Sequence, residues 1–214
     1  MSGSKESSVK SQTDNEVIKR RMSSEDRQSE IIRVAVELAA EKDLSSVTTQ
    51  DMADAMNLTQ GAIFRHFASK DDIWLAVMNW IRERLMSVLS KAAADASDPL
   101  DAIHRMFLAH IAFISKYPAI PRIIFSELQN RKDGKIRHLI QEIMSGYEGR
   151  IANLLEEAKL QSLVNAELDS KNAAVLYIGM IQGLVMQISI FGGKRSLMQE
   201  AEKTFPVFLY GIKN

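Results

Sequence analysis

The chain has 214 residues, of which 46% are hydrophobic, enough to bury a full core and to build one compact domain and one larger one. Lys and Arg together number 27, as do Asp and Glu, so no overall basic field indicates a nucleic-acid partner. Cysteine is absent, which excludes disulfides, thiolate metal sites and cysteine redox switches.

Residues 1–23 are rich in Ser, Lys, Gln, Asp and Glu and contain no apolar run. This composition is neither that of a signal peptide nor that of a membrane anchor, and we expect a disordered arm. Three cations lie near its end, Lys19, Arg20 and Arg21. They leave two interpretations open: a basic arm that reaches the minor groove of DNA, or a solvated tail.

The local chemistry of residues 47–70 predicts two short helices joined by a tight turn. Thr48 is a good N-cap, and Asp51 three residues later completes a capping box. Asn57 tolerates the left-handed conformation that the turn needs, and Thr59 caps the second helix. Apolar residues at helical spacing are expected to face inward: Val47, Met52, Ala53, Met56, Leu58, Ile63 and Phe67.

The second of these helices is expected to present Gln60, Gly61, Phe64 and Arg65 outward, a face that suits the DNA major groove. Gln can hydrogen-bond adenine and Arg can hydrogen-bond guanine, while Gly61 leaves room for a close backbone approach. Side chains that would hold phosphates without reading sequence are Thr59, His66 and Lys70. Any small three-helix bundle also needs caps and a turn, but several independent signals within 24 residues favour DNA binding.

Residues 25–75 resemble the DNA-binding domain of the TetR (tetracycline-repressor-like) family of bacterial regulators. The likeness is carried by IIRVAVELAAEK at residues 31–42, VTTQDMADAM at 47–56, TQGAIFRHF at 59–67 and the Ser-Lys pair at 69–70. Asp43 and Asn57 replace glycines common in the family, and Phe64 replaces a tyrosine whose hydroxyl commonly reaches a phosphate. The resemblance implies a helix-turn-helix domain over residues 24–70, with Thr48 and Thr49 among its DNA contacts, and a helical regulatory and dimerisation domain over residues 71–214.

From residue 69 onward the apolar spacing is helical throughout. It predicts a long helix over residues 74–89, another over 103–114, a short segment over 121–130 and a long helix over 136–158. Asp169 caps an eighth helix that runs to Gly192, and Ser196 starts a last one that reaches Ile212. Pro206 should kink or restart that last helix. The expected fold is therefore all-α, with about nine helices.

The helix that follows Asp169 is apolar on nearly all sides. A membrane span is rejected because the helix is short for that role and carries Gln182, Gln187 and Ser189. We expect one side to pack on its own core and the other on a second subunit, with the last helix as its partner in a two-fold four-helix bundle. The residues expected at this interface are Gly179, Gly183, Gln187, Phe205, Phe208 and Leu209. A central position in a monomer is the alternative.

The family resemblance also implies an inducer pocket among the middle helices. Its candidate residues are Trp80, Phe107, His110, Phe113, Phe125, Met144, Tyr147 and Met180. The 11 methionines of the chain would suit an adaptable apolar cavity. Aromatic and Met residues at helical spacing are nevertheless more often plain core, and His110 on an apolar stripe is more typical of a core histidine than of a ligand contact.

The sequence contains no Gly-rich phosphate loop, no nucleophile elbow and no metal-ligand motif, so we expect neither an enzyme nor a bound cofactor. We expect a cytoplasmic, nucleoid-associated homodimer of the TetR type. It would be a repressor that a small, largely apolar inducer releases from a pseudo-palindromic operator in double-stranded DNA. Two alternatives remain: a TetR-like DNA-binding protein without an inducer, and a helical protein-interaction module.

Overall fold

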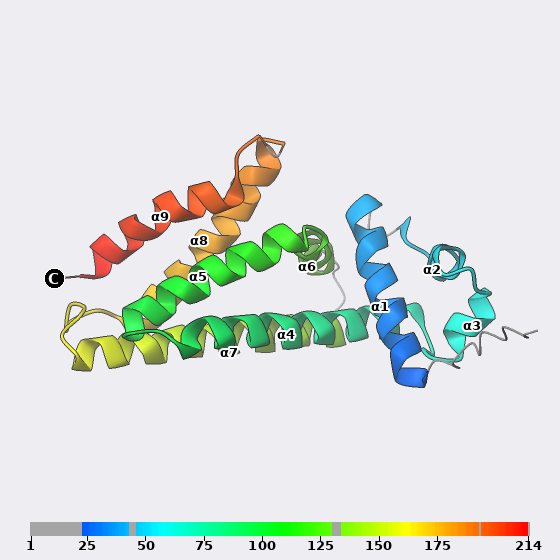
Figure 1. The fold of residues 1–214 in the computed structure, drawn as a ribbon, viewed down its shortest axis with the longest axis horizontal. Coiled ribbons are helices and arrows are strands. Elements are labelled where there is room, and N and C mark those ends of the chain that lie inside the picture. The colour runs from blue at the N-terminus through cyan, green and yellow to red at the C-terminus, as the bar shows by residue number, and fades with distance from the viewer. Residues whose placement is uncertain (1–22, 43–45, 130–133, 193, 214) are drawn as a thin grey trace, which may run out of the picture.

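The computed structural model describes residues 23–42, 46–129, 134–192 and 194–213, and in these the chain forms nine α-helices and no β-strand (Figure 1). The all-α fold expected from the sequence is confirmed. An N-terminal head comprises α1 to α3, and an elongated body comprises α4 to α9 (Figure 1). The helices are α1 (Ser24–Glu41), α2 (Thr49–Ala55), α3 (Gln60–Phe64), α4 (Lys70–Ala94), α5 (Pro99–Lys116), α6 (Ala119–Gln129), α7 (Lys135–Leu160), α8 (Ser170–Ile190) and α9 (Leu197–Ile212).

Local capping explains where the helices of the head begin. The side chain of Thr48 accepts a hydrogen bond from the backbone N–H of Asp51, whose side chain accepts one from the backbone of Thr48, and together they form the expected capping box of α2. Thr59 caps α3 in the same way, although without the reciprocal bond. Between these helices Asn57 has a φ of 53°, the left-handed conformation that the turn requires. The helix-turn-helix geometry therefore follows from short-range chemistry.

The head is joined to the body by packed helices. α1 packs against both α4 and α6, and α4 runs from the head along the length of the body (Figure 1). Ser69 caps α4 only two residues after Phe67, which packs against the core of the head. Arg122 of α6 donates a hydrogen bond from Nη1 to the carbonyl oxygen of Ala40 near the end of α1, at 3.1 Å. Two helices of the body thus hold the position of the head.

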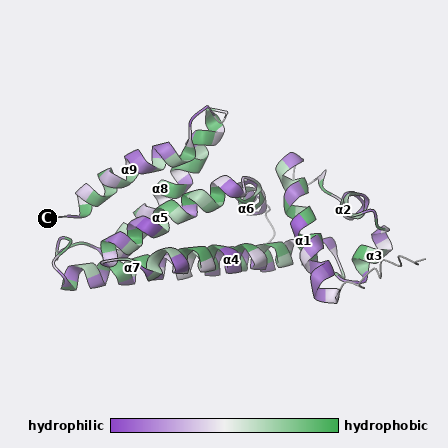
Figure 2. Ribbon diagram, in the orientation of Figure 1, coloured by the Kyte–Doolittle hydropathy of each residue, from purple (hydrophilic) through white to green (hydrophobic). Residues whose placement is uncertain are grey.

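Most helices of the body are amphipathic, and their ribbons in Figure 2 carry both hydrophobic and hydrophilic stretches, whereas α8 is apolar on its buried and its exposed side. α4 packs on α5 and α7, and α8 packs on α7 and α9. A cluster of buried aromatic rings connects α5, α7, α8 and α9: Phe107, Tyr147, Tyr177, Phe205 and Phe208. Within it the hydroxyls of Tyr147 and Tyr177 lie 3.1 Å apart, and the hydroxyl of Tyr177 donates a hydrogen bond of 3.3 Å to the carbonyl oxygen of Ile103, so both polar atoms have partners inside the core.

Two proline positions differ from the sequence-based expectation. α6 begins at Ala119, so Pro121 lies in its first turn instead of opening the helix. Proline is tolerated there because the first four N–H groups of a helix have no partner within the helix. α9 runs as one helix through Pro206, so of the expected kink or restart the restart does not occur. Because proline has no backbone N–H, the carbonyl oxygen of Glu202, four residues earlier, lacks its helical donor. Pro206 and Glu202 are both exposed, so water can solvate this carbonyl.

Candidate DNA-binding surface and ligand cavity

The face of α3 expected to read DNA is open to solvent. Gln60, Gly61 and Arg65 are exposed, and the ring of Phe64 is 45% exposed although it is large and apolar. Ile63 on the opposite side is fully buried in the head. α3 itself is shorter than the sequence suggested, since the helix ends at Phe64 with Arg65 as its C-cap. The short helix still offers an exposed amide, a guanidinium and an apolar ring on one surface.

Thr49 does not belong to this exposed surface, which corrects one of the expected contacts. Its side chain is buried, and its Oγ1 accepts a hydrogen bond of 2.7 Å from Nε2 of Gln60. Because this bond joins α2 to α3, Thr49 lies behind Gln60 and orients its amide. The sequence could not indicate this pairing, because the two residues are 11 positions apart and meet only when the turn is formed.

The side chains expected to hold phosphates have mixed surroundings. Thr48 and Thr59 are exposed, but both hydroxyls cap helices. His66 has its Nδ1 3.2 Å from the hydroxyl oxygen of Ser24. Lys70 is half-buried at the first position of α4. These residues do not form one cluster: His66 lies beside Ser24 at the start of α1, whereas Thr48 binds Asp51, which pairs with Lys42 at the end of α1.

One ion pair fixes the start of α2 against the end of α1. Nζ of Lys42 lies 2.6 Å from Oδ1 of Asp51, and Thr48 donates two further hydrogen bonds to the same carboxylate. The hydrogen bond from Lys42, followed by those from Thr48, holds the pKa of Asp51 well below its usual value. The carboxylate therefore stays ionised, and the first helix of the helix-turn-helix keeps its cap at any physiological pH.

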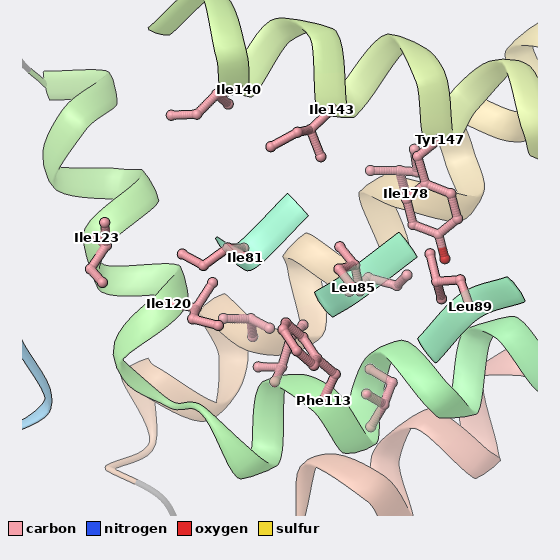
Figure 3. Close-up of a cluster of buried hydrophobic side chains, with 14 of the residues drawn as sticks. Ile81, Leu85, Leu89, Phe113, Ile120, Ile123, Ile140, Ile143, Tyr147 and Ile178 are labelled. Atoms are coloured by element: carbon pink, nitrogen blue, oxygen red, sulfur yellow. The ribbon is translucent and has the colours of Figure 1, made fainter. Parts of the chain in front are cut away.

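The body contains an apolar cavity of about 350 Å³ among α4, α5, α6, α7 and α8. Figure 3 shows Ile81, Phe113, Ile120 and Ile143 extending toward one another from four of these helices. The lining residues include many branched aliphatic side chains: Ile81, Leu85, Ile114, Ile120, Ile124, Ile140, Ile143, Ile178, Ile181 and Val185. A volume of this size lies at the lower end of the range for small-molecule sites.

Half of the residues expected to contact a ligand border this cavity: His110, Phe113, Phe125 and Met144. The other four lie elsewhere in the structure. Trp80 packs edge-on against Tyr117 and borders a surface groove beside α1, and Met180 borders a groove between α8 and α9. Phe107 and Tyr147 belong to the aromatic cluster of the core. Their spacing was helical and apolar in the same way as that of the lining residues, so the sequence alone did not separate core from cavity.

The polar groups of the cavity lie in two places. Gln141 and Ser145 of α7 and Gln182 of α8 are exposed, so they lie where the cavity approaches solvent. His110 of α5 is only 9% exposed, and its Nδ1 has no hydrogen-bond partner in the described part of the chain. Burial lowers the pKa of His110 to about 4, so its imidazole is neutral at pH 7. None of the described residues that line the cavity is Lys, Arg, Asp or Glu.

The outer face of α8 and α9 is apolar and exposed. Val207 is 72% exposed, and large apolar side chains accompany it: Val175, Leu176, Met186, Ile190 and Tyr210. Gly179, Gly183 and Gln187 are exposed on α8, as expected for an interface. Phe205 and Phe208 are instead buried in their own protomer, and Leu209 is half-buried against the core, so these three do not provide the expected exposed contacts.

By length and composition α8 is also apolar enough to cross a membrane, and it is the one such helix among the described residues. One side of α8 nevertheless belongs to the protein core, because Tyr177, Ile178 and Ile181 are buried where α8 packs on α7 and α9. A helix that spanned a bilayer would have to withdraw these residues from the core.

The part of the chain that the structure describes contains no cluster of His, Asp or Glu able to hold a metal ion.

An exposed helix-turn-helix on a helical body defines a class of protein, the helix-turn-helix DNA-binding regulators. Residues 31–77 match the family of bacterial regulatory proteins called tetR, and residues 81–211 match the C-terminal region of YsiA-like proteins. The chain belongs to the TetR family, as the sequence resemblance implied. It is a DNA-binding transcriptional regulator, and regulators of this family bind DNA operators and are not enzymes.

Individual proteins resemble the chain at lower identity. The nucleoid occlusion factor SlmA of Vibrio vulnificus is 25% identical over 158 residues, which are 73% of this chain and 81% of SlmA. The fatty acid degradation regulator FadR of Bacillus halodurans aligns with a TM-score of 0.75 at 20% identity, over 89% of this chain and 97% of FadR. FadR of Bacillus subtilis, solved in complex with stearoyl-CoA, aligns with a TM-score of 0.74 at 19% identity, over 86% and 98% of the two chains. At these identities the two solved structures show a shared fold.

Proposed function

We propose that the protein is a dimeric repressor that leaves a pseudo-palindromic operator when a small, largely apolar ligand occupies the cavity of the body. The observation that carries this proposal is the cavity of about 350 Å³, which is lined mostly by hydrocarbon and lies among helices that also hold the head. Side chains usually fill such a space in a purely structural core. A ligand site accounts for a cavity of this size and composition.

The proposed DNA contacts divide by chemistry. Gln60 and Arg65 carry the hydrogen-bonding groups that read base edges, and Phe64 packs on a sugar or a thymine methyl group. Thr48, Thr59, His66 and Lys70 would hold phosphates. Gly61 permits a close approach, since a Cβ at this position would meet only Oγ1 of Thr59, at 3.9 Å. Thr49 enters this scheme as the residue that positions Gln60.

The proposed dimer uses the exposed apolar face of α8 and α9. Monomeric soluble proteins rarely expose a contiguous apolar patch that includes side chains as large as Leu176, Met186, Val207 and Tyr210. A two-fold contact between identical faces would cover them and would place two heads on one side of the assembly. The same contact accounts for the apolar outer side of α8 without a membrane, which supports a cytoplasmic, nucleoid-associated protein.

The proposed coupling runs through α4 and α6. Ile81 and Leu85 of α4 line the cavity, and the same helix begins at the head with Lys70. α6 lines the cavity with Ile120 and Ile124 and holds α1 through Arg122. A ligand that shifts either helix would change the tilt of the two heads and their fit to two half-sites. The domain boundary that we propose, after residue 70, falls at the start of α4.

The test is fluorescence anisotropy with DNA from upstream of the protein's own gene, at two salt concentrations and beside a scrambled duplex of equal length. We expect tight binding that survives physiological salt and exceeds binding to the scrambled duplex by at least about a thousandfold. Gln60→Ala combined with Arg65→Ala should remove the preference while leaving residual salt-dependent binding. Equal binding of both duplexes by the wild type would contradict sequence-specific repression at this site.

A second arm of this experiment tests the ligand. Uncharged hydrophobic compounds are added one at a time to the preformed complex of protein and operator. Stearoyl-CoA is tested as a further compound, because a structural neighbour was solved in complex with it. Release of the operator by at least one compound supports the inducible repressor. The likeness to a nucleoid occlusion factor favours a second candidate function, a DNA-bound protein that no small molecule displaces. Operator binding that every compound leaves unchanged would favour this second candidate.

A further inference from the structure

His110 is the one buried polar side chain that borders the cavity among the described residues. Its Nδ1 is shielded from solvent and has no hydrogen-bond partner there. The imidazole packs against the ring of Tyr147, with centroids 5.5 Å apart, but the hydroxyl of Tyr147 is committed to Tyr177. A buried polar atom without a partner is destabilising, so most such atoms in proteins have one. The unmet hydrogen-bonding capacity of His110 therefore requires an explanation.

The surroundings of His110 restrict what could satisfy it. The side chains that line the cavity carry no formal charge, and an ionised group placed among them would lose its hydration without gaining a counter-ion. A neutral imidazole has one N–H donor and one acceptor nitrogen, so it can pair with a hydroxyl or a carbonyl oxygen. The remaining walls near it, including Phe113, Ile114 and Ile178, offer only hydrocarbon.

We infer that the cavity binds an uncharged, mostly hydrocarbon molecule with one hydroxyl or carbonyl oxygen, and that this oxygen forms a hydrogen bond with the imidazole of His110. The inference rests on the proposed function of the cavity as the ligand site, and it adds the chemical class of the ligand. A pure hydrocarbon leaves His110 without a partner. A carboxylate would have a charged partner only if the buried imidazole were protonated, and burial opposes that charge. Alcohols and ketones with a compact apolar skeleton provide a hydrogen-bonding partner for His110 and bring no charge into the cavity.

The test compares four molecules of one skeleton on the full-length protein: decalin, 2-decalol, 2-decalone and decalin-2-carboxylate. Each displaces N-phenyl-1-naphthylamine, an uncharged fluorescent probe, from the wild type, His110→Phe, His110→Gln and Met86→Leu. The ratio of the decalin to the 2-decalol dissociation constant is the quantity of interest, since differences in fold stability cancel in it. Met86→Leu is the control because Met86 of α4 packs against the hydrophobic core and does not line the cavity, and the change keeps its volume and its apolar character.

We expect 2-decalol and 2-decalone to bind the wild type at least as tightly as decalin, and the carboxylate to bind at least about tenfold more weakly. In His110→Phe the ratio should fall about tenfold, because the buried hydroxyl loses its partner. His110→Gln keeps a hydrogen-bonding group and Met86→Leu lies outside the cavity, so both should stay within about threefold of the wild-type ratio. A wild-type ¹⁵N spectrum provides a measurement that needs no variant: the ring nitrogens of His110 should shift with 2-decalol and not with decalin.

The outcomes separate the inference from the function on which it rests. An unchanged ratio in a folded His110→Phe, unshifted ring nitrogens, or tightest binding by the carboxylate would overturn the assigned ligand class, while displacement of the probe would leave the cavity as a ligand site. Failure of the probe to bind at all would reject the cavity as a site, and the inference with it.

Discussion

Thr49 and Gln60 illustrate how a buried hydroxyl can orient a side chain that reads bases. The bond between Nε2 of Gln60 and Oγ1 of Thr49 directs the amide carbonyl away from α2 and toward the exposed side of α3. Thr49→Val keeps the shape of the side chain but leaves the amide free to rotate. We expect about a tenfold loss of affinity for the operator, the size of one hydrogen bond, and little change for scrambled DNA.

Thr49→Ser is the control for this prediction, because serine restores the acceptor. Anisotropy titrations with both duplexes measure the effect, and melting curves check that the head remains folded. If Thr49→Val weakened binding to both duplexes equally, Thr49 would have a general structural role and not one in positioning Gln60.

Because His110 is buried, the free energy of unfolding should depend on pH, and it should do so at pH values above those at which ordinary carboxylates titrate. Its pKa is lowered by burial to about 4 in the folded protein, against 6.5 in the unfolded chain. Between these values the unfolded state binds a proton that the folded state refuses, so stability is complete above pH 6.5 and is lost as the pH falls toward 4. From pH 6.5 to pH 5 the loss is about 2 kcal/mol.

Urea unfolding at pH 7 and pH 5, at one fixed protein concentration, measures this dependence. His110→Phe lacks the titrating group and should lose about 2 kcal/mol less than the wild type between the two pH values. The difference between the two proteins isolates His110 from every other titrating residue. Identical pH dependence in both would mean that the imidazole is not buried in solution.

The turn between α2 and α3 depends on one backbone conformation. Asn57 has a φ of 53°, which a β-carbon disfavours unless a short polar side chain compensates. Asn57→Gly should leave the stability of the head unchanged or raise it, whereas Asn57→Val should lower it by about 1–2 kcal/mol. Chemical denaturation followed by circular dichroism measures both variants. Equal stability of the two would show that the turn adopts another conformation in solution.

Helix starts were predictable because the chemistry that sets them is local. Thr48, Thr59, Asp169 and Ser196 all act as N-caps, as their sequence contexts indicated. Each cap needs only residues within one turn, so no tertiary contact is required to recognise it. The same holds for Asn57 in the turn. These local signals predicted where most helices begin and where the turn between α2 and α3 lies. The spacing of apolar residues predicted which face of α3 is exposed.

Which side of an apolar helix faces the core was harder to predict, because the hydrophobic periodicity is lost when both sides are apolar. α9 carries Phe205, Val207, Phe208 and Tyr210 within two turns, and the sequence pointed to the two phenylalanines as the interface. The structure buries both and exposes Val207 and Tyr210. The choice depends on which side meets Phe107 and Tyr177, a long-range contact. The cavity is also a long-range property, since five helices must assemble before a space between them exists.

Arg122 provides a test of how the cavity communicates with the head. Its hydrogen bond to the carbonyl of Ala40 joins α6, which lines the cavity, to α1. Arg122→Ala should leave operator affinity within about threefold without ligand, but should weaken the release that a ligand causes. Arg105→Ala is the control, because Arg105 pairs with Asp101 on α5 and does not contact the head. Normal release by Arg122→Ala would assign the coupling to α4 alone.

The exposed face of α8 and α9 determines whether the protein can read two half-sites at once. Each chain has a mass of 24.0 kDa, and we expect sedimentation velocity to give twice that mass. Val207→Asp places a charge in the centre of the apolar face and should dissociate the dimer, because a carboxylate buried against Val, Leu and Met lacks a counter-ion. Operator affinity should then fall by at least about a hundredfold, since one head alone loses the gain from bivalent binding. Leu160→Asp, at a residue of α7 that is 88% exposed and lies outside this face, should leave both mass and affinity unchanged. A dimer that survives Val207→Asp would place the two-fold axis on another surface of the body, and the apolar face of α8 and α9 would then need a different partner.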